Sequence, residues 1–203
     1  MKVYLISNNL VLENIVYETD ETLEQKRINR PLSIMGEKKA MDLAKKVNVQ
    51  IIYSSFYASA LATAKYLRSK NDVVISINSN LKDAVIGELG SKNIKNLRLM
   101  QEKDFNYRYI NGESLNDTKL RMKKIMQKII SSSDGDVAVV THKRAIMSYL
   151  LDYTEKGYNL DDRLILSFKE KVIIDDAEND MNVIVMTVED GQIIDIDHIE
   201  GGE

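Results

Sequence analysis

The sequence predicts an α/β fold built around a mostly parallel sheet. The first observation is the continuous apolar run at residues 3–6, which suits a strand buried on both faces. The second is the alternation of short apolar runs with helical patterns over the first 150 residues. The third is the polar turn after several strands, because ligands of such sheets bind outside the carboxyl ends of the strands.

Length and composition limit the class of protein. The 203 residues are enough for one domain with a sizeable core, so we expect a single domain over residues 1–203. A net charge of −3 provides no cationic footprint for nucleic acid, and no run of 18 apolar residues could span a membrane. The N-terminal apolar run is too short for a signal peptide, so we expect a cytoplasmic protein.

The sequence contains no recognisable pattern of metal ligands. There is no cysteine, which excludes disulfides, thiolate metal sites and a cysteine nucleophile. The two histidines, His142 and His198, are far apart, and the carboxylates show no recognisable ligand spacing. We therefore predict neither a metal site nor a cofactor, and we expect His198 on the surface.

The first half of the chain predicts two further strands and two helices after the first strand. Residues 10–32 are polar and are expected to form a solvated loop over the carboxyl edge of the sheet. Ser33 suits the N-cap of the first helix. The remaining elements are a helix over 34–47, a strand over 49–53, a helix over 56–69 and a strand over 73–77.

The second half begins with a less regular stretch. Residues 81–112 contain two glycines and mixed charge, which indicates an excursion above the sheet, with 91–110 as a candidate lid. Ser114 is expected to cap a long helix that ends near Ser131. After it we expect a strand over 137–140, a helix over 144–152, and strands over 164–168, 171–174, 183–188 and 193–198.

Four segments carry a resemblance to a known family. Met1–Asn14 is similar to a strand followed by an R-H-G loop, and residues 29–40 to a P-L-[TS]-x-x-G-x-x-Q-A segment. Residues 52–64 are similar to S-S-P-x-x-R-A-x-x-T-A, and residues 112–114 and 139–142 to G-E-S and V-V-T-H-G. Together they resemble the histidine phosphatase superfamily, the phosphoglycerate-mutase-like group, which implies a three-layer α/β/α sandwich.

The resemblance also implies a phosphate site and its chemistry. In that family a histidine of the first loop attacks phosphorus, two arginines and a second histidine bind the oxygens, and a carboxylate protonates the leaving group. By this correspondence Asn8 stands at the nucleophile, and Ser7 and Ser59 stand at the two arginines. An Asn amide is no phosphoryl nucleophile, and deleting a nucleophile costs on the order of 10⁶ in turnover in a comparable enzyme.

The other positions of the site are changed less. Asn9 stands at the glycine of the loop, Asn14 keeps the family's Asn, and Asp83 stands at the acid position. Only the second histidine is retained, as His142, and Lys143 follows it at a loop position where it could bring a cation near the site. With both arginines lost we expect a less cationic pocket, and we expect Arg144 to be solvated.

The leading hypothesis is a pseudophosphatase with a binding or regulatory role towards a small molecule or a protein. The expected pocket consists of Ser7, Asn8, Asn9, Asn14, Ser59, Asp83, His142 and Lys143. The alternative is an enzyme of altered or residual hydrolase or phosphatase activity that uses His142 and Asp83. An edge strand from the C-terminal group could also pair two copies into a homodimer.

Overall fold

The computed structural model describes residues 1–7, 10–16, 21–91, 93–175 and 183–199. Asn8 and Asn9 of the expected pocket therefore lie outside the described residues. In the described part of the chain, no helix has the length and apolar character needed to cross a membrane.

A mostly parallel sheet forms the centre of the fold, as predicted. Its strands lie in the order β3-β2-β4-β1-β8-β9, with β1 to β4 parallel and the last two antiparallel. Because Ser7 pairs with Thr141 across β1 and β4, the carboxyl ends of these strands meet at one edge. The strands are β1 (Lys2–Ser7), β2 (Ile51–Ser54), β3 (Val74–Ile77), β4 (Val137–Thr141), β8 (Val183–Glu189) and β9 (Gln192–Ile199).

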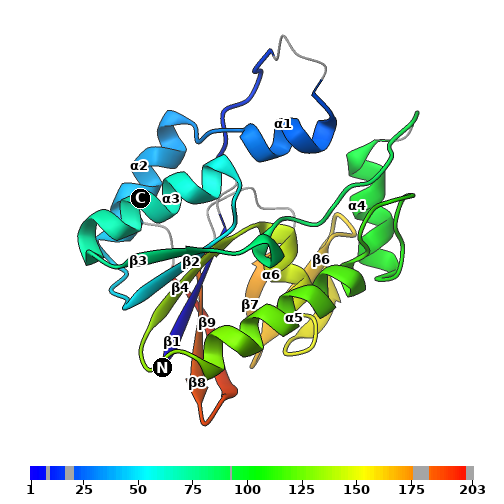
Figure 1. The fold of residues 1–203 in the computed structure, drawn as a ribbon. Coiled ribbons are helices and arrows are strands. Elements are labelled where there is room, and N and C mark those ends of the chain that lie inside the picture. The colour runs from blue at the N-terminus through cyan, green and yellow to red at the C-terminus, as the bar shows by residue number, and fades with distance from the viewer. Residues whose placement is uncertain (8–9, 17–20, 92, 176–182, 200–203) are drawn as a thin grey trace.

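Helices cover both faces of this sheet (Figure 1). Helices α2 (Ile34–Ala44) and α3 (Ala58–Asn71) lie on one side, and α5 (Leu115–Ser131) and α6 (Lys143–Leu150) on the other. Val3 and Leu5 of β1 pack into the core under α5 and α6, whereas Tyr4 and Ile6 pack into the core under α2 and α3. The continuous apolar run of the first strand is thus buried on both faces, as predicted.

A second sheet is antiparallel and contains β5 (Glu155–Tyr158), β6 (Leu164–Phe168) and β7 (Lys171–Asp175). The sequence predicted β6 and β7 but not β5. All four residues of β5 are exposed, so the strand carries no alternation of apolar and polar residues that would reveal it.

Two helices lie beyond the carboxyl edge of the central sheet, α1 (Leu23–Asn29) and α4 (Ile94–Lys103) (Figure 1). The prediction of a loop over 10–32 is therefore wrong at α1. None of its residues is buried, and local hydrogen bonds hold its start: Thr22 Oγ1 accepts from the Gln25 amide at 3.2 Å, and Gln25 Oε1 accepts from the Thr22 amide at 2.8 Å. That residues 91–110 form a lid stays a prediction.

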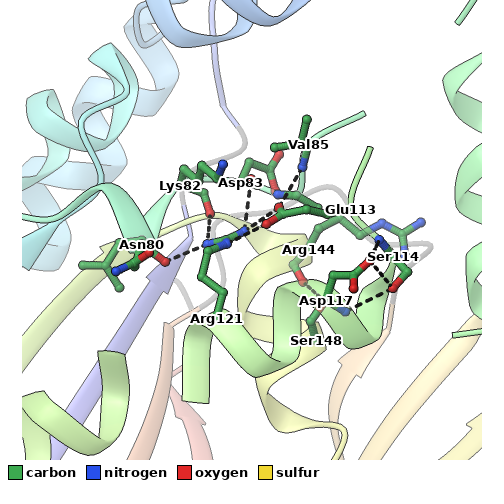
Figure 2. A network of polar contacts seen from close by, with 12 residues as sticks. Asn80, Lys82, Asp83, Val85, Glu113, Ser114, Asp117, Arg121, Arg144 and Ser148 are labelled. Atoms are coloured by element: carbon green, nitrogen blue, oxygen red, sulfur yellow. Dashed lines mark hydrogen bonds and ion pairs between the residues drawn. The ribbon is translucent and has the colours of Figure 1, made fainter. Parts of the chain in front are cut away.

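A network of polar contacts fixes the segment between β3 and α4 (Figure 2). Arg121 of α5 donates to the carbonyl oxygens of Asn80 and Lys82 at 2.6 and 3.1 Å. It also donates to both carboxylate oxygens of Glu113, at 2.8 and 2.7 Å. Glu113 in turn accepts from the Val85 amide at 3.0 Å. Residues 80–85 are therefore held in place by one bidentate ion pair.

Replacing Gly36 by alanine tests the packing of α2 against the segment that follows β1. A Cβ at this position would lie 2.2 Å from the Leu10 carbonyl oxygen, which also accepts from the Ser33 amide at 3.0 Å. Gly36→Ala is expected to lower the free energy of unfolding by about 1–3 kcal/mol in urea titrations, although helix propensity alone favours alanine by about 1 kcal/mol.

Gly157→Ala is the control, because a Cβ there would meet nothing within 4 Å. It should change the stability by less than about 0.5 kcal/mol. A Gly36→Ala protein more stable than the wild type would contradict the close approach of Leu10.

Removing Arg121 tests the network in Figure 2. The side chains of Arg121 and Glu113 are only 12% and 18% exposed, so Arg121→Ala leaves a mostly buried carboxylate without its main partner. The free energy of unfolding should fall by about 3 kcal/mol or more. Arg108→Ala is the matched control, since the Arg108–Asp117 pair is 57% and 38% exposed and should contribute less than about 1 kcal/mol. Equal losses of stability in Arg121→Ala and Arg108→Ala would contradict the conclusion that Arg121 holds residues 80–85 in place.

Candidate functional site

A cavity of about 730 Å³ lies where α1, α3, α4 and α6 come together. Ser59, Asp83, His142 and Lys143, all expected in the pocket, line it. The structure does not bring every expected residue there. Ser7 is fully buried at the end of β1 and is not among the lining residues. Asn14 is exposed with a left-handed backbone (φ 57°), and it does not line the cavity either.

His142 directly follows β4 and is almost buried, with 8% of its surface exposed. Its Nε2 lies 2.9 Å from Ser55 Oγ, and its ring packs on Tyr57 with the ring centroids 4.4 Å apart. Burial, helped by the nearby positive charge of Arg27, lowers the pKa of His142 to about 4, although Asp83 opposes this shift. The imidazole is therefore neutral at neutral pH and has a hydroxyl as its polar partner.

Asp83 lines the same cavity and is held by Arg27, a residue that no sequence motif indicates. Arg27 of α1 forms an ion pair with Asp83 Oδ2, and the Ala84 amide donates to Oδ1 at 2.9 Å. Burial alone would raise the pKa of Asp83, but the charges of Arg27 and Arg98 contribute to a net shift below its ordinary value. Asp83 is thus an ionised carboxylate.

Arg27 also binds Glu24, the residue of α1 that contacts Tyr57 of the cavity. Its Nη1 donates to Glu24 at 2.7 Å and to the Ala84 carbonyl oxygen at 3.2 Å. The other Glu24 oxygen accepts a hydrogen bond from the Tyr57 hydroxyl, and burial together with this bond raises the pKa of Tyr57. Arg27 was missed because the charges of residues 10–32 were interpreted as solvated.

A buried carboxylate, Glu102, holds two further arginines of the cavity. Arg144, which is 6% exposed, donates to Glu102 Oε1 at 2.9 Å. Arg163 donates to both Glu102 oxygens at 3.0 and 3.1 Å, and the Leu164 amide donates at 3.0 Å. The prediction that Arg144 is solvated is therefore wrong. Its side chain points into a buried ion cluster that joins α4, α6 and the start of β6.

Positive charge predominates around the cavity, so the expectation of a less cationic pocket is also wrong for the described residues. Two carboxylates, Glu13 and Asp83, line it. The cationic lining residues are Arg27, Arg30, Lys95, Arg98, Lys143, Arg144 and Arg163. Most of them belong to α1, α4 and the approach to β6, and they do not occupy the positions where the resemblance implies arginines. This charge favours anionic ligands.

No cluster of three or more metal-ligating side chains occurs in the described ranges. The described residues that line the cavity include hydroxyls, a neutral imidazole, a paired carboxylate and several cations. Such groups can bind and orient an anion. Neither His142 nor Asp83 has a pKa near neutrality, as efficient proton transfer requires.

Comparisons with solved structures give the same fold at low identity. YhfR of Bacillus stearothermophilus is 19% identical with a TM-score of 0.62, over 98% of this chain and 96% of its own. A mycobacterial glucosyl-3-phosphoglycerate phosphatase is 17% identical with a TM-score of 0.58, over 84% and 98%. Mycobacterial hydrolase 2 is 14% identical with a TM-score of 0.64, over 98% and 88%. A search of curated protein sequences finds no match.

A family model supplies the sequence-level link. The model of the histidine phosphatase superfamily (branch 1) matches residues 18–186, which include α1, Asp83, α4 and His142. The matched range begins after the first strand and its loop, so it excludes Ser7 and Asn8. The predicted resemblance is confirmed: the chain belongs to the histidine phosphatase superfamily.

Proposed function

We propose that this protein is a catalytically impaired histidine phosphatase whose cavity binds a ligand without hydrolysing it. The observation that carries the proposal is the state of His142 and Asp83. His142 is a buried neutral imidazole beside Ser55, and Asp83 is an ionised carboxylate in an ion pair with Arg27. A general acid has to be in its protonated form at working pH, and at pH 7 His142 is not an imidazolium and Asp83 is not a carboxylic acid.

The replaced residues support the same proposal. Asn8 stands where the resemblance implies the nucleophilic histidine, and Ser7 and Ser59 stand where it implies arginines. Ser59 faces the cavity with a short side chain that is 4% exposed, so it presents at most a hydroxyl to a ligand. By this correspondence a covalent phosphoenzyme route lacks its attacking histidine and the two arginines that the resemblance implies for binding the phosphate.

The competing proposal is an enzyme of altered or residual hydrolase activity that uses Asp83 and His142. Both residues line one cavity, and Asp83 influences the pKa of His142 through its charge. A base with a pKa near 4 is weak at neutral pH, however, and Asp83 is already neutralised by Arg27. These properties favour binding over turnover.

The neutral state of His142 predicts a pH dependence of stability. Its pKa is about 4 in the folded chain and 6.5 in the unfolded chain. Between these values the unfolded chain binds a proton that the folded chain does not, so the free energy of unfolding falls as the pH falls. The loss linked to His142 should reach about 3 kcal/mol near pH 4, and none of it is present above about pH 7.

Urea unfolding at pH 7 and pH 4.5 measures this loss. His142→Asn should lose less stability than the wild type between these values, because Asn carries no proton to take up. His198→Asn, which changes the other histidine of the chain, should keep the wild-type dependence. Identical pH dependence in His142→Asn and the wild type would contradict a neutral buried imidazole.

Hydrolysis of p-nitrophenyl phosphate tests the proposed loss of catalysis. The native chain should release no p-nitrophenol above the buffer rate, because it lacks the nucleophile. A repaired variant with Ser7→Arg, Asn8→His, Asn9→Gly and Ser59→Arg should show turnover if the scaffold is intact. The matched control carries the same changes without Asn8→His and should be inactive. Clear turnover by the native chain that His142→Ala abolishes would contradict the proposal.

A further inference from the structure

We propose that helix α1 is a strap over the cavity, latched by the ion pair between Arg27 and Asp83, and that opening of this strap uncovers His142. The helix lies beyond the carboxyl edge of the central sheet, and the structure corresponds to its latched form (Figure 1). The proposal goes beyond the proposed function, because the strap limits access to the cavity whether a ligand is hydrolysed or only retained.

Helix α1 cannot hold its own position. It has seven residues, whereas isolated helices shorter than about 12–15 residues are marginal in water. None of its residues is buried. The capping box of Thr22 and Gln25 supports the first turn, but these hydrogen bonds form within the helix and its cap. The place of α1 in the fold therefore depends on contacts between its side chains and other elements.

Two of these contacts are apolar and only partly buried. Leu23 packs against the small cluster of Ile86, Leu97 and Tyr109. Ile28 packs against the core under α2 and α3. Because the hydrophobic contribution scales with the apolar area removed from water, half-buried side chains of this kind hold a helix less firmly than a buried stripe does.

The polar contacts of α1 end on residues next to or inside the cavity. Arg27 pairs with Asp83 and donates to the Ala84 carbonyl oxygen at 3.2 Å, and Glu24 accepts from the Tyr57 hydroxyl. The side chains of Arg27 and Asp83 are only 13% and 16% exposed, so water screens their attraction less than it would screen a surface pair. This ion pair is therefore the latch of the strap.

The base of the strap is fixed, and a possible hinge lies beside it. The Leu12 amide donates to the Pro31 carbonyl oxygen at 2.9 Å, and the Ser33 amide donates to the Leu10 carbonyl oxygen at 3.0 Å. Arg30, between α1 and this base, has an extended backbone (φ −68°, ψ 117°). Rotation at Arg30 can move α1 while the base and α2 keep their places.

The residue that receives the latch stays in place when α1 opens. Asp83 belongs to the segment that Arg121 holds through the carbonyl oxygens of Asn80 and Lys82 (Figure 2). Thr141 fixes the same segment through the Leu81 carbonyl oxygen at 2.7 Å. Opening therefore separates a mobile cation from a fixed carboxylate, and the latch can form again in the same geometry.

The strap shields His142 through Tyr57. Glu24 holds the Tyr57 hydroxyl, and the Tyr57 ring packs on His142 with the ring centroids 4.4 Å apart. In this arrangement only 8% of His142 is exposed. Opening of α1 removes Glu24 from the Tyr57 hydroxyl and frees the ring to turn away. The histidine at the end of β4 then becomes accessible from the cavity.

Chemical modification of the two histidines tests the proposal. Diethyl pyrocarbonate modifies uncharged imidazole, and peptide mass spectrometry at pH 8 gives the rate at each histidine of the full chain. Arg27→Gln should speed the modification of His142 at least about tenfold, because the strap loses its latch. His198 on β9, with a side chain that is 31% exposed, is the internal reference and should keep its rate within about twofold.

A second variant breaks the same ion pair without changing the sequence of α1. Asp83→Asn should also speed the modification of His142 at least about tenfold, and the double variant should exceed neither single variant by more than about twofold. In all three, amide hydrogen exchange should become faster in α1 and stay unchanged in α5, which shows that the fold is intact. Arg108→Gln, which breaks an exposed ion pair, is the control and should keep the wild-type rate.

Two results would overturn the proposal. One is a wild-type rate at His142 in both Arg27→Gln and Asp83→Asn. The other is equal acceleration at His142 and His198, or equally faster exchange in α1 and α5, because the whole fold rather than the strap would then be opening. Hydrolysis of p-nitrophenyl phosphate decides the proposed function separately, since the strap makes no claim about turnover.

Discussion

A buried carboxylate requires a cation. At Asp83 this requirement determines how several elements are held together at the carboxyl edge of the sheet. Arg27 of α1 forms the ion pair with Asp83, and the same guanidinium binds Glu24. Glu24 in turn accepts a hydrogen bond from the Tyr57 hydroxyl. Tyr57 packs on His142. These contacts together connect α1 with Asp83, with the N-cap of α3 and with the residue that follows β4. An isolated buried charge would cost several kcal/mol, so these elements are fixed together by the need to pair Asp83.

The polar network around Arg121 holds the segment that carries Asp83 in place. Arg121 and Glu113 bind the main chain on both sides of Asp83 through its neighbours Asn80, Lys82 and Val85. Thr141 adds a hydrogen bond of 2.7 Å to the Leu81 carbonyl oxygen. The carboxylate therefore has little freedom to leave Arg27. Rigid pairing of this kind suits a binding cavity, whereas a general acid has to exchange its proton with the ligand.

Much of the fold could be predicted from the sequence because it depends on hydrophobic pattern and local capping. The apolar run from Val3 to Ile6 predicts a strand buried on both faces, and Ser114 is predicted as an N-cap; both are observed. The regions predicted wrongly carry no such pattern. Helix α1 buries none of its residues, so its sequence looks like a solvated loop. Charged residues on such segments appear solvated until the tertiary structure brings them to a partner.

The candidate site shows the same division. His142 could be placed at the end of a predicted strand and Asp83 through the family resemblance, and both line the cavity. Arg27 and Arg144 could not, since their roles depend on Asp83 and Glu102, which are 56 and 42 residues away in the sequence. No periodicity or spacing encodes such a pairing. The cationic character of the cavity was missed for that reason, although the loss of the family's arginine positions was visible.

The Glu102 cluster has a mechanical consequence for α4. Glu102 lies near the C-terminal end of this helix, with its side chain bound by Arg144, Arg163 and the Leu164 amide. Moving that end of the helix away would leave the buried Glu102 carboxylate without its cations, at a cost of about 3–5 kcal/mol. The C-terminal end of the helix is therefore fixed to α6 and to the start of β6. Its N-terminal half is held as well, because Leu97 is buried against Ile86 and Tyr109, and α4 therefore keeps Lys95 and Arg98 at the cavity.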